Sequence, residues 1–582
     1  MTQLPVLPST RSSYLSSPRF LPGLALASVL LLGWILRGIY ILGPDLPPGA
    51  NGGYYPVQAR AILRTGWPAL PDLPLLFYLQ ALTGWALSWF MSLEHALVLA
   101  TRLTDTFLPV LIAIPVYWYA REFAEKERYC HTWASATFLT GLAAVGNHAL
   151  LRMAGDFQKN TVALPLFLFY AYYMYMSHRE PGRKNYLLAM IFLVLIGLTH
   201  LGVTGLTLSF TGLYLLIGLA ARKEYQKIGI AAVILSAILA ATLFLASYFD
   251  PVRVGRLAFV MTYPYRLLSQ SVLLSLMAGR GGGPAPEIGG YLLGNALILL
   301  GLGIVFRRRD RVEPVTLQFL ETAGLCALFL CSPLIHFDIS SRLVLMAHVP
   351  ALVLMAFIVA RYPWGWKFGL PAAAVVVAGG LLSMLFGPPM SFSRDEYQEL
   401  KQFRDSLPEG KTLAVARHGL EWWVAWTMET RITNQANLAV KTWNQYDAVV
   451  SVEETITRDR PENRPPGPPR PEDREPVTGP PGRRPLDRPE GPGGSGKPGG
   501  PGGPGSSGPG GPGGPSPFFP RSNSAGGDPM REAVSDFFTK EQIREGRFFR
   551  LYRLRLKASS TGERQGWIEQ SEAHSIKDNI DS

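Results

Sequence analysis

Cysteine and charged residues are both scarce in this sequence. Its three cysteines, Cys130, Cys326 and Cys331, are too few for a disulfide framework, and none has the CxxC or histidine spacing of a zinc site. Only 17% of the 582 residues are charged, whereas a soluble chain has about 25%, and 48% are hydrophobic. These shortages exclude a disulfide-stabilised domain and a uniformly soluble fold.

Long apolar runs dominate the chain between residues 21 and 386. Eleven runs of roughly 17–25 residues, each long enough to cross about 30 Å of hydrocarbon as a helix, alternate with short polar breaks. The first run contains Trp34 and Arg37 and lacks a small-x-small cleavage site before Pro44, so we expect a retained span and not a signal peptide. The sequence therefore predicts an all-α membrane bundle over 22–387. The predicted spans are residues 22–42, 95–120, 132–150, 161–177, 186–201, 203–220, 228–249, 287–306, 315–335, 343–360 and 368–387.

Lysine and arginine are unevenly distributed between alternate loops. One set of loops carries 17 of these residues and the opposite set carries nine. Because cytoplasmic loops carry the excess, we expect residues 1–21 in the cytoplasm and everything after residue 388 outside. The chain is thus predicted to be a multi-pass protein of the inner or plasma membrane. Its net charge of +12 is a sign of this topology and does not indicate a nucleic-acid partner.

The part after the last predicted span has the pattern of a small extracytoplasmic α/β domain, formed by residues 388–457 and 530–560. Residues 458–529 are rich in Pro, Gly and Arg with almost nothing to bury, so a disordered insertion is predicted there, and a flexible C-terminus at 561–582. Within the domain, helices are predicted at 394–407 and 531–543, and strands at 412–417, 446–452 and 548–556.

Ionisable residues near membrane depth are costly and therefore mark candidate functional sites. The outer loop 43–94 is the richest stretch and is predicted to be catalytic. A carboxylate placed where a helix leaves the bilayer could act as a general base, although Asp45 could equally cap a proline-rich turn. The other candidates in this loop are Tyr54, Tyr55, Arg60 and Asp72.

A second outer loop carries Asp156 between Arg152 and Lys159. If this stretch is helical, both cations lie near the acid, and a salt-bridged helix end would explain the same pattern. Arg102 and Asp105 are three positions apart inside the second span, and we expect them to pair.

Two further candidates lie near the ends of other spans. Arg342, at the predicted outer mouth of a span, suits a phosphate contact. His200 lies at a turn between helices, where it is either a ligand or a satisfied core histidine.

The order of these motifs resembles the GT-C superfamily of polytopic membrane glycosyltransferases, in particular the protein O-mannosyltransferases and lipid A aminoarabinose transferases. The likeness rests on a first span, an outer loop of the form Asp…Tyr…Ala…Ile-Leu…Gly…Pro…Pro-Leu…Tyr, and Glu94-His95-Ala96-Leu97 leading to Arg102-Leu103. It covers about residues 20–560 without the insertion. A weaker resemblance joins 421–437 to the WWDYG region of the oligosaccharyltransferase catalytic subunit, but the Asp-Tyr-Gly is absent, and the indoles are equally typical of membrane anchors or a domain core.

The resemblance implies that a sugar leaves a polyprenyl-phosphate donor for a lipid, glycan or protein acceptor on the extracytoplasmic face. Asp45 would be the base for the acceptor hydroxyl. Asp156 would orient the acceptor or, in metal-using branches, help to hold a divalent cation such as Mg or Mn. Residues 46–53 are an insertion relative to the family pattern, so Asp72 remains a rival to Asp45. The predicted phosphate contacts are Arg152, Lys159 and Arg342, and the further substrate-binding candidates are Tyr54, Tyr55, Arg60, Asp72 and His200.

Two other classes of protein remain open. A transporter or lipid-carrier flippase would also place ionisable groups in a bundle, but such proteins typically contain internal repeats with broken helices, and none is found here. A membrane scaffold displaying the Pro/Gly arm would explain the insertion but not the charged outer loops.

Overall fold

A computed structural model describes nine stretches of the chain: residues 20–49, 51–124, 129–249, 285–334, 337–385, 392–417, 419–434, 445–455 and 538–556. The predictions for residues 458–529, for 561–582 and for nearly all of 1–21 lie outside these stretches.

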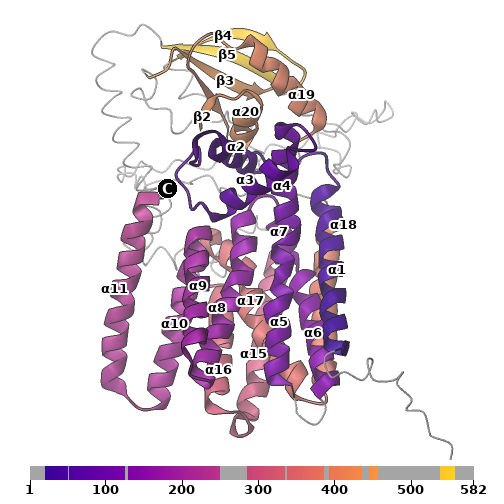
Figure 1. Cartoon of the computed structure of the whole chain (residues 1–582), viewed down its shortest axis with the longest axis vertical. Coiled ribbons are helices and arrows are strands. Elements are labelled where there is room, and N and C mark those ends of the chain that lie inside the picture. Colours follow the sequence, from indigo (N-terminus) through magenta and orange to yellow (C-terminus); the bar gives the residue numbers. More distant parts are fainter. Residues whose placement is uncertain are drawn as a thin grey trace, which may run out of the picture. The chain divides into compact units, whose positions relative to one another are not determined.

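Each of the eleven predicted spans coincides with helical structure (Figure 1). Within the nine described stretches, five segments are long and apolar enough to cross a membrane: Phe20–Leu42, Leu93–Phe123, Leu201–Ala221, Arg342–Arg361 and Gly365–Leu382. A multi-pass helical membrane fold is therefore confirmed, whereas the count of eleven spans stays a prediction. The helices are α1 (Phe20–Leu42), α4 (Leu93–Phe107) continued by α5 (Ala113–Phe123), α6 (Tyr129–Val145), α8 (Gln158–Arg179), α9 (Arg183–Thr199), α10 (Leu201–Ala221), α11 (Tyr225–Phe249), α15 (Ala285–Arg307), α16 (Pro314–Leu330), α17 (Phe337–Arg361) and α18 (Gly365–Leu385).

Small residues allow the closest helix contacts in the bundle. A Cβ atom on Gly33 of α1 would lie 2.8 Å from the Val110 side chain, and one on Gly141 of α6 would lie 3.0 Å from the Val29 side chain. Such close approach is the usual basis of helix association in lipid, where no hydrophobic effect drives two apolar helices together.

A buried ion pair fixes the position of α4 against α1. Arg37 contacts Asp105 at 2.7 Å between Nη2 and Oδ1, and both side chains are fully buried. The same guanidinium donates to the carbonyl of Leu150, while the second carboxylate oxygen of Asp105 accepts the N–H of Gly155 at 2.8 Å. The predicted pairing of Asp105 with Arg102 is wrong. Arg102 instead donates to the carbonyl of Ile41 in the last turn of α1, where unpaired C=O groups attract a cation, and to the carbonyl of Pro44 just beyond it.

A five-stranded sheet of order β2-β1-β3-β5-β4 follows the last helix of the bundle. Strand β1 pairs in parallel with β2 and β3, and β5 pairs antiparallel with β3 and β4. Parallel neighbours need a crossover, and α20 supplies the one between β1 and β2. The elements are β1 (Thr412–Ala416), β2 (Arg431–Asn434), β3 (Ala448–Glu454), β4 (Phe538–Glu545), β5 (Phe549–Leu556), α19 (Arg394–Phe403) and α20 (Leu420–Thr427).

The sheet confirms most of the predicted elements in this part of the chain. The helix at 394–407 and the strands at 412–417, 446–452 and 548–556 are present. The helix predicted at 531–543 is wrong over its described residues, because Phe538–Glu545 is a strand. Pairing with β5, from Phe538 opposite Leu556 to Glu545 opposite Arg550, overrides the helical preference of the Lys-Glu-Gln sequence.

The Arg37–Asp105 pair should contribute to the stability of the folded protein. Replacing Arg37 with Met leaves a buried carboxylate without its cation, and Asp105→Asn leaves the cation without its carboxylate, so each change should lower the unfolding free energy by about 3–5 kcal/mol. The double variant buries no unpaired charge, so its unfolding free energy should fall by less than the sum of the decreases in the two single variants. Unfolding of the full chain in detergent measures all four proteins, and strictly additive losses would contradict the pairing.

Candidate functional site

Two short helices, α2 (Tyr54–Thr65) and α3 (Leu75–Leu87), follow α1 and pack against each other; α2 also packs against α20, and α3 against α4 (Figure 1). Tyr55 and Phe77 from these helices share one apolar core with Trp423 of α20 and Phe549 of β5. We call this part of the molecule the loop end; it comprises residues 43–92, the turn 146–157 and α20. It contains most of the candidate residues predicted from the sequence.

Two glycines let the loop 43–53 lie directly on the turn 153–156. Gly155 has φ +78°, and a Cβ atom there would lie 1.9 Å from the carbonyl oxygen of Pro48. Gly49 has φ +89°, and its Cβ would lie 2.4 Å from a carboxylate oxygen of Asp156. Any other residue at either position would be both strained and blocked by this contact.

Tyr54, Asp72 and Lys159 form a buried cluster, the Tyr54–Asp72–Lys159 cluster. The Lys159 ammonium pairs with Oδ1 of Asp72, with side chains 5% and 2% exposed, and lies 5.5 Å from the centre of the Phe77 ring. Tyr54 donates to the other carboxylate oxygen at 2.5 Å, and the N–H of Leu73 donates to Oδ1 at 2.7 Å. Both oxygens of Asp72 are therefore engaged inside the protein.

This cluster corrects one sequence interpretation. Lys159 pairs with Asp72 and not with Asp156, because the stretch from Arg152 to Lys159 is not one helix. Helix α7 (His148–Arg152) ends at Arg152, the positive φ of Gly155 interrupts the backbone, and α8 begins at Gln158.

Asp156 is half-buried and faces the loop that follows α1. Its Oδ1 accepts the N–H of Asn51 at 2.9 Å, and its carbonyl accepts the hydroxyl of Tyr55 at 3.3 Å. The Tyr55 oxygen in turn accepts the N–H of Gln158 at 2.9 Å. Burial, reinforced by the charge of Asp105, raises the pKa of Tyr55 well above its ordinary value, so this hydroxyl stays protonated and acts as a linker.

Asp45, Arg152 and Arg342 have more accessible side chains. Asp45 is exposed, and its carbonyl accepts a hydrogen bond from Arg102 at 3.3 Å. Arg152 is half-buried in the last turn of α7, and Arg342 is exposed near the start of α17. Of the ten residues predicted from the sequence, Asp45 and Arg342 are therefore the two that are exposed.

Two predicted substrate-binding residues make contacts that stabilise helices. His200 caps α10, with Nδ1 accepting the N–H of Val203 at 3.2 Å. Arg60 donates to the carbonyls of Ala425 and Trp426, at 2.9 and 2.8 Å, and lies 4.3 Å from the Trp426 ring centre. Burial lowers the pKa of Arg60 to about 10, so it remains a cation at neutral pH and holds the end of α20. A substrate contact for either residue stays a prediction.

The structure adds buried amides that the sequence interpretation missed. Gln80 donates to Gln158 at 2.7 Å and to Thr104 at 3.2 Å, and Gln58 donates to Tyr54 at 3.0 Å. The signal was available for Gln80, which is the one residue with an amide side chain in the apolar sequence of α3. A lone amide in such a helix needs a partner inside the protein.

The described residues contain no group of three or more His, Cys, Asp or Glu side chains that could hold a metal ion.

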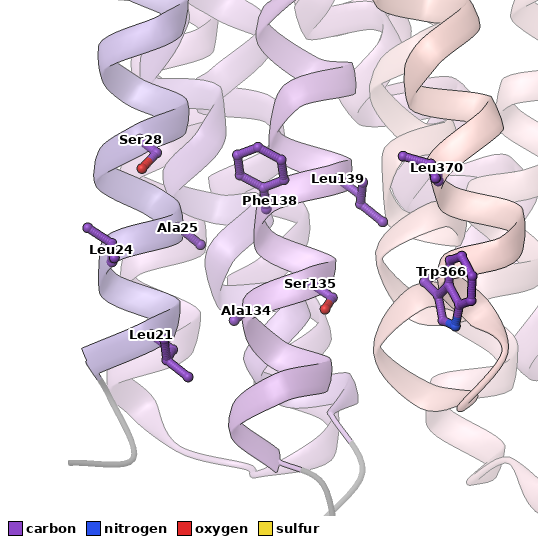
Figure 2. A pocket seen from close by; sticks show the side chains of 10 residues that line it. All are labelled: Leu21, Leu24, Ala25, Ser28, Ala134, Ser135, Phe138, Leu139, Trp366 and Leu370. Atoms are coloured by element: carbon purple, nitrogen blue, oxygen red, sulfur yellow. The ribbon is translucent and has the colours of Figure 1, made fainter. Parts of the chain in front are cut away.

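A groove lies at the opposite end of α1 from the loop end. It has a volume of about 560 Å³ and is formed by residues of α1, α6 and α18, among them Leu24, Phe138 and Trp366 (Figure 2). Its ten lining residues are apolar apart from the hydroxyls of Ser28 and Ser135, so it offers no group for acid–base chemistry.

Taken together, the fold and the site define a polytopic helical membrane protein with polar clusters gathered at one end of the bundle. No protein-family model and no curated protein matches the sequence. Among solved structures, the chain is similar to ArnT from Cupriavidus metallidurans bound to undecaprenyl phosphate, with 14% identity over 74% of this chain and 93% of that chain and a TM-score of 0.45.

The stability of the contact between α2 and α20 should depend on pH through Glu429. Partial burial opposes ionisation of Glu429, but the hydrogen bond from Arg64 and the charges of Arg60 and Arg404 outweigh it and lower the pKa of this carboxyl. Because the folded pKa is lower than the unfolded one, Glu429 stabilises the contact above pH 4.5, its ordinary pKa, and the stabilisation is lost as the pH falls through the folded value.

Glu429→Gln should therefore lower the midpoint of thermal unfolding at pH 7, and the difference from the unchanged protein should disappear on acidification. A difference of equal size at both pH values would show that the charge of Glu429 does not support the contact.

Proposed function

We propose that the chain is an integral membrane glycosyltransferase that moves a sugar from a polyprenyl-phosphate donor to an acceptor hydroxyl at the loop end, on the extracytoplasmic face. The observation that carries the proposal is the loop 43–53, which exposes Asp45 and packs its Gly49–Asn51 side against Asp156. The GT-C resemblance implies one acid in the first outer loop and a second acid in the next, and Asp45 and Asp156 occupy these two positions. The identity of the sugar and the acceptor is left open.

The contacts favour Asp45 over Asp72 as the general base. A base needs an oxygen that can reach the proton of the substrate. Asp72 is 6% exposed and both its oxygens are bound by Lys159, Tyr54 and Leu73. Asp45 is exposed, so its carboxylate can take the acceptor proton and release it to water.

Accessibility also distinguishes between the candidate phosphate contacts. The charge of Lys159 is neutralised by Asp72 in the buried cluster, whereas Arg342 is exposed and Arg152 is only half-buried. As the acceptor oxygen bonds to the anomeric carbon, the bond from that carbon to the phosphate oxygen breaks and the electron pair leaves with polyprenyl phosphate. Arginine is well suited to hold the charge that develops, since its fork of donors matches phosphate geometry.

Asp156 is proposed to orient the acceptor. One of its oxygens is fixed by Asn51, which sets the direction of the carboxylate. If a divalent cation takes part, Asp156 is the residue that would contribute to its binding, but no step proposed here passes through a metal ion.

The first test is the Asp45→Asn variant in proteoliposomes supplied with polyprenyl-phosphate sugars. Loss of a general base should lower the transfer rate by about 10²–10⁴-fold while the protein level and the unfolding midpoint stay unchanged. Asp310→Asn is a matched control, because Asp310 is 94% exposed and lies on the loop before α16, away from the loop end. Equal transfer by the Asp45→Asn and Asp310→Asn variants would refute the assignment of the base.

The second test concerns the leaving group. Arg152→Gln and Arg342→Gln each remove a charge-assisted contact of about 1.5–3 kcal/mol, so we expect about a 10- to 100-fold loss of kcat/KM for the lipid donor. Arg342→Lys should recover part of the loss, since it keeps the charge but not the fork. Unchanged donor kinetics in both Gln variants would remove these residues from the phosphate site.

A further inference from the structure

The segment between Arg64 and Glu94 carries a single residue that is charged at neutral pH. That residue is Asp72, which is buried and paired with Lys159. The rest of the segment, including all of α3, presents no charge to its surroundings. A helix without charges on either face needs an apolar environment on both faces.

One face of α3 has such an environment inside the protein. Leu76, Phe77 and Gln80 are fully buried, and Phe77 lies beneath the ammonium of Lys159. The opposite face and the turn that follows it are bare. Tyr78 (40%) and Met91 (37%) are exposed there. Six further exposed side chains are Leu79 (36%), Leu82 (60%) and Trp85 (49%) of α3, Trp89 (68%) and Phe90 (83%) of the turn, and Trp67 (73%), which the hydrogen bond from Tyr78 to the carbonyl of Gly66 holds near α3. We call these six residues the aromatic platform.

The length of α3 determines whether it can span the membrane or must lie in its interface. Its 13 residues span about 20 Å, which is too short to cross about 30 Å of hydrocarbon. The exposed face excludes a helix buried in a protein core. A short apolar helix with one face on protein and one face bare is typical of a segment that lies in the membrane interface.

We propose that the aromatic platform is inserted into the boundary between headgroups and acyl chains of the leaflet at the loop end. Two observations favour lipid over a protein partner. The platform continues into Leu93, which is 42% exposed and begins the candidate span Leu93–Phe123. It also contains three tryptophans, and the ring centres of Trp85 and Trp89 lie 4.9 Å apart in an edge-to-face contact. Tryptophan is enriched at the interface between membrane and water.

The insertion sets the depth of the polar groups behind α3. Because one helix about 10 Å wide separates the platform from the Tyr54–Asp72–Lys159 cluster, the cluster lies at headgroup level, where a lipid-linked phosphate would also lie. This inference does not depend on the transferase proposal, since lipid contact can be measured without any turnover.

The test uses the full chain with Cys130→Ala, which leaves only the buried Cys326 and Cys331 as native thiols. A polarity-sensitive fluorophore is attached at Phe90→Cys, at Leu82→Cys as a second platform site, and at Glu541→Cys on β4 as the control, whose side chain is 56% exposed. The labelled proteins are placed in nanodiscs of phosphatidylcholine with or without brominated acyl chains.

We expect brominated lipid to quench the labels at 90 and 82 at least twofold more than the label at 541, and aqueous iodide to show the reverse order. Equal quenching by lipid at all three sites would overturn the proposal. Quenching at 90 and 82 that appears only when two copies of the chain share a nanodisc would assign the platform to a protein contact instead, and would also overturn it.

Discussion

The Arg37–Asp105 ion pair is the interaction on which the loop end depends. In the bilayer no water can satisfy a polar group, so this pair must complete its hydrogen bonds within the protein, and it does so through the Leu150 carbonyl and the Gly155 N–H. One contact thereby joins α1, α4 and the turn before α8. Within this turn, Gly155 lies against Pro48, and Asp156 accepts a hydrogen bond from Asn51. The geometry of the loop 43–53 is thus set by charges buried beneath it.

Above this pair, the loop end separates acids that support the structure from acids that are available for chemistry. Asp72 pairs with Lys159 and accepts a hydrogen bond from Tyr54, and Arg60 donates to the end of α20, so these groups link α2, the loop before α3, α8 and α20. Asp45 is left exposed at the edge of this assembly. The apolar outer face of α3 places the whole layer next to lipid, which is where a lipid-linked substrate would arrive.

The sequence predicts the bundle well, since hydropathy over about 20 residues is a local property and α1, α10 and α18 follow it closely. It predicts which loops are rich in candidate residues for the same reason. It fails where partners are far apart in the chain. The pairing of Arg37 with Asp105 crosses 68 positions, and neither that pair nor Lys159 with Asp72 has a local spacing that would reveal it. Strand β4 differs from the predicted helix because pairing with β5, and not its own composition, determines its conformation.

We propose that the donor is cleaved at the loop end, as opposed to being carried across the membrane. Proteoliposomes of the purified chain that contain a polyprenyl-phosphate sugar, labelled in the sugar, together with a mixture of candidate acceptors, distinguish the two. Cleavage should release free polyprenyl phosphate in amounts equal to the label transferred to acceptor. Movement of the intact labelled donor between leaflets, with no release of polyprenyl phosphate, would contradict it and would identify a flippase.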